Sequence, residues 1–215
     1  MFLKCSLNNV QLRMTACFCM LLDHIGFIFL TSTPFEYLLR LIGRIAFPLF
    51  CFLLVEGYVH TRDFGNYVRR ILHVGLLSQL PYSLLFGIGR LNVMFQLLSG
   101  LFLFWLLEHK KSWTPVFCLS LSVILFFSSI SEYGLWGLLL LLTLKCYRDC
   151  SSRCKKWGMI AFFCMMISCS HMGAAVLAVP LMACYNGRLG RRLHRVLEYG
   201  FYPAHMFGLY LLCCI

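Results

Sequence analysis

Long apolar runs, separated by short polar or charged stretches, recur along the whole chain. Hydrophobic residues make up 60% of the 215 and charged residues only 13%. A folded chain of this size has too much surface to hide so many apolar side chains from water, so most of them need lipid as their surroundings. The sequence therefore predicts an all-α fold, a polytopic bundle of transmembrane helices.

A helix needs about 20 mostly apolar residues to cross a bilayer, and runs of about 17 are tolerated. Residues 157–185 are the hardest to divide, because they could form one long helix, two short helices that turn at 170–173, or a re-entrant pair. We predict about nine spans, with eight as the alternative, in a single membrane domain over residues 1–215. The segments are 15–30, 38–58, 71–86, 93–107, 115–130, 135–147, 157–168, 173–185 and 202–215.

The net charge of +11 comes from short Lys and Arg clusters between apolar runs. Such clusters set orientation and contact anionic headgroups, so we expect membrane lipid and no nucleic acid as partner. With nine spans and a cytoplasmic N-terminus, Arg90 is the basic residue left outside, together with Glu36 and Glu132. One span over 157–185 would put four Arg between Arg188 and Arg195 outside, which favours two crossings. The residues predicted inside are Lys4, Arg13, Arg62, Arg69, Arg70, Lys110, Lys111, Lys145, Arg148, Arg153, Lys155, Lys156, Arg188, Arg191, Arg192 and Arg195.

Most of the 13 cysteines lie inside apolar runs, where a thiol behaves as a small hydrophobic group. Cys146, Cys150 and Cys154 recur every four residues and would share a helix face, but paired C-x-x-C motifs indicate zinc far more strongly. We predict no metal site. The first 13 residues are too polar for a signal peptide and lack a small-x-small cleavage site, so we expect the first span to be retained.

Asp23 and His24 lie well inside the first apolar run. An ionisable group at the centre of a bilayer costs about 2.5 kcal/mol or more, so it marks a functional site or a buried polar network. A carboxylate can orient an imidazole and raise its basicity, as a general base requires. Adjacent residues point about 100° apart on a helix, however, so the alternative is that Asp23 pairs with another span as a polar clamp.

Arg40 and Arg44 are four residues apart and share a helix face near the predicted outer end of the second span. Pairing with Asp23, snorkelling to headgroups and contact with a substrate are the alternatives for this pair. Pro48 lacks the N–H that bonds back one turn, so we expect it to kink the helix.

Glu56 and His60 share a face at the cytoplasmic end of the same span and could act as general base and orienting group. Arg62, Arg69 and Arg70 follow at the same level. Arginine holds phosphate in a forked geometry, so these residues suit a phosphorylated cofactor, and headgroup contact is the alternative.

The last span begins at Tyr202, and the sequence places Tyr202 and His205 near the same cytoplasmic level as these arginines. Other polar residues lie within or beside spans and are expected to form hydrogen bonds between helices. They are Gln79, Asn92 and Gln96.

Four stretches carry a resemblance to a known family: LDHIG at 22–26; residues 40–62 with IGR, AFPLF and EGYVHT; LSQLPY at 77–82 with LNV at 91–93; and YNG at 185–187 with YPAH at 202–205. Together they are similar to the TraX-type membrane proteins, which are associated with N-terminal acetylation of conjugative pilin. The second stretch is the most specific, because composition alone seldom places polar residues at those intervals in an apolar helix. Residues 110–156 match no motif of the family.

The resemblance implies a membrane acyltransferase in the bacterial inner membrane, taking an acetyl group from acetyl-CoA on the cytoplasmic side. The acceptor is an amine or hydroxyl, which could be the N-terminus of a pilin-like protein. His24 would be the general base, with Asp23 tuning or orienting it and Arg44 stabilising negative charge. Glu56 and His60 form the rival catalytic pair.

Under the same resemblance, the acetyl-CoA phosphates would be held by Arg62, Arg69 and Arg70, with Tyr202 and His205 nearby. Two other classes of protein stay open. A transporter with a proton or anion pathway would use the same buried charges, although the sequence shows no inverted repeat. A non-catalytic partner in surface-fibre assembly is the third hypothesis.

Overall fold

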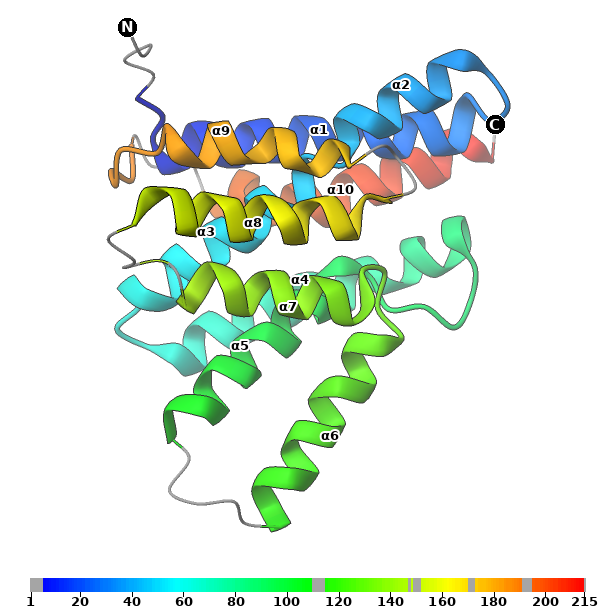
Figure 1. Ribbon diagram of the computed structural model, residues 1–215. Helices are drawn as coiled ribbons and strands as arrows, with labels where there is room; N and C mark the ends of the chain where they lie inside the picture. Colours follow the sequence, from blue (N-terminus) through cyan, green and yellow to red (C-terminus); the bar gives the residue numbers. More distant parts are fainter. Residues whose placement is uncertain are drawn as a thin grey trace, which may run out of the picture. The chain divides into compact units, whose positions relative to one another are not determined.

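The computed structural model describes residues 6–109, 115–146, 148, 152–169, 173–190 and 195–214, without the side chains of 115, 116, 153, 154 and 195–198. Over these residues the chain forms helices and no β-strand, which confirms the predicted all-α fold (Figure 1). The elements are α1 (Asn9–Phe29), α2 (Pro34–Gly43), α3 (Ala46–His60), α4 (Phe64–Phe86), α5 (Val93–His109), α6 (Pro115–Ser129), α7 (Gly134–Cys146), α8 (Arg153–Ile167), the 3₁₀ helix η2 (Ala174–Leu177), α9 (Ala178–Ala183) and α10 (Arg195–Cys213).

Two described helices are long and apolar enough to cross a membrane, Asn9–Phe29 and Pro34–His60. The second consists of α2 and α3 with the turn between them. Shorter apolar helices, such as Val93–His109 and Gly134–Cys146, coincide with other predicted spans. These helices support a membrane protein, while nine crossings stay a prediction.

The second predicted span is interrupted at residues 44–45, four residues before Pro48. The N–H of Ile45 donates to the carbonyl of Ile42, a tighter step than the α-helical bond. Pro48 is the third residue of α3, in the first turn, where a backbone N–H has no acceptor within the helix and its absence costs no hydrogen bond. The kink predicted at Pro48 was therefore placed too late in the chain.

Residues 157–185 form two helical segments. Helix α8 ends at Ile167, and η2 packs against α8 before it leads into α9. Gly173 has a φ of 70°, a conformation that favours glycine, and its N–H donates to the carbonyl of Ser168. One continuous helix is thus excluded, whereas the turn residues 170–172 lie outside the described residues.

The chain divides into two compact units, each made of two segments. Unit 1 comprises Met1–Glu56 and Thr143–Phe201, and unit 2 comprises Gly57–Leu142 and Tyr202–Ile215. In unit 1, α1 and α2 form a hairpin, drawn in two blues at the upper right of Figure 1. The single domain over 1–215 stays a prediction.

The start of α1 is bound to the segment after α9, also within unit 1. The N–H of Leu7 donates to the carbonyl of Cys184, and the N–H of Asn186 donates back to the carbonyl of Leu7, both at 2.9 Å. Asn8 caps α1 by accepting from the N–H of Gln11 at 2.9 Å. This end of unit 1 is therefore fixed by backbone bonds between segments far apart in sequence.

Several sequence predictions fall outside the described part of the chain. Cys150 and the side chain of Cys154 do, so the predicted cysteine face cannot be placed. The same holds for some residues predicted to carry cytoplasmic charge: Lys4, Lys110, Lys111, Arg191 and Arg192, and the side chains of Arg153 and Arg195.

Candidate functional site

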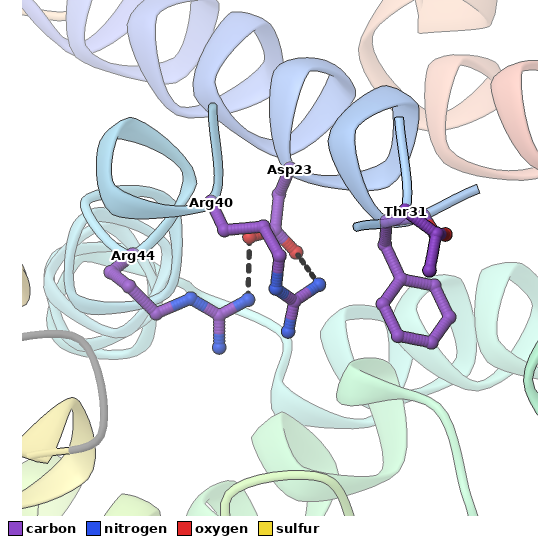
Figure 2. Close-up of polar contacts among 5 residues, drawn as sticks. Asp23, Thr31, Arg40 and Arg44 are labelled. Atoms are coloured by element: carbon purple, nitrogen blue, oxygen red, sulfur yellow. Dashed lines mark hydrogen bonds and ion pairs between the residues drawn. The ribbon is translucent and has the colours of Figure 1, made fainter. Parts of the chain in front are cut away.

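The carboxylate of Asp23, on α1, lies between two guanidinium groups that follow each other by one helical turn (Figure 2). Nη2 of Arg44 donates to Oδ1 at 2.5 Å, and Nη1 of Arg40 lies 3.6 Å from Oδ2. Asp23 and Arg44 are buried and Arg40 is half-buried. Pairing with Asp23, one of the alternatives for Arg40 and Arg44, is therefore what the structure shows.

A glycine makes this close approach feasible. A Cβ added to Gly43 would overlap the Asp23 side chain, with Cγ of Asp23 only 2.7 Å away. On α1, a Cβ at Gly26 would lie 2.9 Å from Cβ of Leu39. Small residues let helix backbones approach closely in membranes, and here they bring the carboxylate against α2.

His24 is buried as deeply as Asp23, each exposing 6% of its surface. The ion pairs of Asp23 are formed with Arg40 and Arg44. That Asp23 also orients His24 for catalysis stays a prediction. The arrangement places an imidazole next in sequence to a carboxylate that two cations hold in an apolar hairpin.

A second polar cluster in unit 1 surrounds Glu56, near the end of α3. Oε1 of Glu56 accepts a hydrogen bond from Nε of Arg148 at 2.8 Å, and Glu56 is buried. His60, its predicted partner, is exposed at the end of α3. The sequence predicted Arg148 only as a cytoplasmic charge, because nothing in its spacing relates it to Glu56, 92 residues earlier.

A cavity of about 310 Å³ adjoins this pair. Lys156, in the first turns of α8, donates from Nζ to the carbonyl of Arg148 at 2.8 Å and lies 5.2 Å from the ring centroid of Trp157. Tyr185 closes another side, edge-on to Phe52 at 5.3 Å. We call this cavity, lined by Glu56, Arg148, Lys156, Trp157 and Tyr185, the Glu56 pocket.

In unit 2, the predicted phosphate-binding arginines lie exposed around the start of α4. Asp63 caps that helix by accepting from the N–H of Asn66 at 2.8 Å, and this bond, with the charges of Arg69 and Arg70, lowers the pKa of Asp63. Arg69 also donates to Oδ1 of Asn66 at 2.6 Å, while Arg62 lies in the preceding loop. Their binding of a phosphorylated ligand stays a prediction.

Tyr202 does not join these arginines. It is buried, with its ring centroid 5.4 Å from that of His205, and its hydroxyl interacts with the backbone of Val93 beside Tyr82. Tyr82 follows Arg70 by 12 residues on α4, about 18 Å along the helix at 1.5 Å per residue. Helix α10 begins at residue 195, two turns before the predicted start of the last span at Tyr202, and cofactor binding by Tyr202 stays a prediction.

The predicted hydrogen bonds between segments of unit 2 are confirmed. Oε1 of Gln79 accepts from the N–H of Asn92 at 3.1 Å, and Nδ2 of Asn92 donates to the carbonyl of Gly75 at 2.8 Å. Nε2 of Gln96 donates to Oγ of Ser128 at 3.0 Å, which links α5 to α6. These amides act as structural bonds inside apolar surroundings.

Comparison with known proteins identifies the family. A family model described as TraX protein matches residues 8–213. The chain belongs to the TraX family. A curated relative, the probable fimbrial assembly protein FimC, serogroup H1, of Dichelobacter nodosus, is 28% identical over 224 residues, covering 91% of each chain. No solved structure matches significantly.

The two polar clusters relate differently to the stretches that resemble TraX. Asp23, Arg40 and Arg44 all come from those stretches. In the Glu56 pocket, Arg148 and Lys156 come from residues 110–156, where no TraX motif was recognised. Sequence resemblance could therefore indicate the cluster around Asp23. For the Glu56 pocket it could indicate only part of the lining.

Proposed function

We propose that this TraX-family chain is a membrane acetyltransferase that moves an acetyl group from acetyl-CoA to an amine or hydroxyl acceptor. The observation that carries the proposal is the burial of His24, which directly follows Asp23 in sequence, while Arg40 and Arg44 hold the Asp23 carboxylate. Imidazole is the side chain most often used as a general base, and cations held nearby stabilise negative charge that develops during acyl transfer.

In this mechanism, His24 takes the proton of the acceptor amine or hydroxyl as the acceptor atom forms a bond to the acetyl carbonyl carbon. The carbon–sulfur bond of the thioester breaks, and the departing thiolate receives the proton from His24. Arg44 would stabilise the negative charge on the carbonyl oxygen during the attack. Each transfer thus consumes one acetyl thioester and releases one free thiol.

A pilin-like protein is the proposed acceptor, at its N-terminal amine. The description of the Dichelobacter nodosus relative as a probable fimbrial assembly protein supports this choice. The apolar helices of the chain also suit an acceptor that is itself held in a membrane before fibre assembly. We propose the bacterial inner membrane as the location, with the donor supplied from the cytoplasm.

The test uses purified protein in nanodiscs, radiolabelled acetyl-CoA and a peptide copying a pilin N-terminus from the same cells. We expect His24→Ala to lose at least 100-fold in transfer rate, the usual contribution of a general base. His73→Ala is the matched control, because His73 is exposed on α4, and it should keep the wild-type rate. Full activity of His24→Ala would move the role of base to His60 or His205.

A non-catalytic role in fibre assembly is the second candidate, favoured by the same description of the relative. Mass spectra of surface proteins from cells with and without the chain separate the two. An acetyltransferase leaves one surface protein lighter by one acetyl group in the cells that lack it. Loss of an assembly partner instead changes the amount of fibre and leaves the masses of the surface proteins unchanged.

A further inference from the structure

The Glu56 pocket has an excess of positive charge in a site shaped by several elements. Among the described lining residues, the carboxylate of Glu56 faces two cations, Arg148 and Lys156, so this part of the lining carries a net charge of +1. Arg148 is paired with Glu56 at 2.8 Å, and Lys156 supplies the additional positive charge. A cavity wall with such an excess of positive charge favours an anionic ligand.

Lys156 is positioned to bind such a ligand. Its ammonium has three N–H donors, and one of them is directed to the carbonyl of Arg148. That bond holds the ammonium at the pocket wall and leaves further donors for an oxyanion. Lys156 also lies in the first turns of α8, the end at which the helix dipole favours negative charge.

The rest of the lining is aromatic and apolar. Trp157, Tyr185 and Phe52 are half-buried in the wall, and Met182 is buried there. Aromatic faces stack on nucleobases without regard to sequence. A volume of about 310 Å³ is at the lower end of ligand pockets and suits one end of a coenzyme A molecule.

We propose that the Glu56 pocket binds the phosphorylated adenosine end of the acetyl donor, an inference that rests on the proposed function. Lys156 contacts a phosphate, and Arg148, held by Glu56, supplies the second cation. Trp157 provides a surface for the base. This assigns donor binding to unit 1, with Arg148, Lys156 and Trp157 outside the motifs that carry the sequence resemblance.

The test compares two neighbouring lysines in phosphatidylcholine nanodiscs by isothermal titration with coenzyme A. Lys156→Gln should weaken binding about tenfold, because it removes a hydrogen bond between charged groups. Lys155→Gln removes the same charge from an exposed position outside the pocket and should bind as the wild type does. Lys156→Arg, which keeps the cation, should retain most of the affinity.

A shortened donor locates the contact. S-acetylpantetheine lacks the nucleotide and its phosphates, so Lys156→Gln should bind it as tightly as the wild type does. Equal losses for both ligands, or equal affinities of Lys156→Gln and Lys155→Gln for coenzyme A, overturn the proposal. If the wild type binds phosphatidylglycerol vesicles more tightly than Lys156→Gln does, and both bind coenzyme A equally, the pocket would instead be assigned to lipid headgroups.

The proposed function and the pocket can fail separately. Suppose that the wild type transfers acetyl groups, and that Arg69→Gln weakens coenzyme A binding while Lys156→Gln does not. The pocket assignment is then wrong and the proposed function stands. If the wild type neither binds coenzyme A nor transfers label, the proposed function itself fails. Size-exclusion profiles matched to the wild type show that each variant is folded, and Lys156→Arg provides the comparison if Lys156→Gln is not.

Discussion

Asp23 holds α1 against the two arginines of the second apolar segment, and under the proposed function it would also serve the chemistry. Its carboxylate contacts guanidinium groups on both sides, and the cluster of Asp23, Arg40 and Arg44 carries a net charge of +1. Inside apolar surroundings each charge needs its partners, because an unpaired buried ion costs several kcal/mol. The same excess of positive charge is what an acyl-transfer site needs near a developing oxyanion.

The structural part of this role can be measured with Arg44→Met. We expect it to lower the free energy of unfolding by about 3 kcal/mol, the low end for breaking a buried pair, because Arg40 stays near Asp23. Fluorescence-detected unfolding in detergent measures the change. Arg90→Met, at an exposed loop position, is the control and should change stability little.

The double variant Asp23→Leu with Arg44→Met separates stability from chemistry. Replacing both members of a buried pair by apolar groups is often neutral, so much of the lost stability should return. Acetyl transfer should stay low, because the cation near the thioester is still missing. A double variant that regains full transfer would show that the pair is structural alone.

At the scale of helices, the hairpin of α1 and α2 depends on glycine at the contact. Gly43→Ala would place a methyl group against the Asp23 side chain, where no flexible chain end can give way. We expect the helices to move apart, with weaker ion pairs, lower thermal stability and reduced transfer. Overpacking of this kind typically costs about 1–3 kcal/mol.

Gly158→Ala is the matched control in α8 of the same unit, since a Cβ there meets nothing within 4 Å. It should be neutral or stabilising by up to about 1 kcal/mol, because alanine is the better helix former. Thermal midpoints of the two variants, measured side by side, test the prediction. Equal midpoints would mean that the close contact at Gly43 is relieved without cost.

Helices were predictable because hydropathy and length act locally, and each predicted span coincides with a helix or a pair of helices. The start of α10 at residue 195 was not predictable, because polar helical residues outside the apolar run carry no hydropathy signal. The interruption before Ala46 was not predictable either, because it lies inside residues 38–58, which hydropathy indicates as one span. The Asp23 cluster could be predicted from the cost of burying charge. The Glu56 pocket could not, since Arg148 and Lys156 reach it only through the packing of α3, α7 and α8.

For the whole molecule, charge asymmetry predicts an orientation in the membrane. Nine crossings with a cytoplasmic N-terminus put residue 215 on the outer side, whereas eight crossings put it inside. The separation of α8 from α9 fits either two crossings or a re-entrant pair over residues 157–185. The side of the membrane on which residue 215 lies therefore distinguishes one crossing from two over residues 157–185.

Alkaline phosphatase fused after Ile215 should be active in cells, because this enzyme needs the oxidising outer compartment for its disulfides. Green fluorescent protein at the same position should be dim, and both results should reverse for fusions after Arg188, which lies in a loop predicted inside. An inactive phosphatase with a bright fluorescent fusion at Ile215 would support eight crossings. That outcome would also move Arg188 to the outer side, against the charge separation predicted for nine crossings.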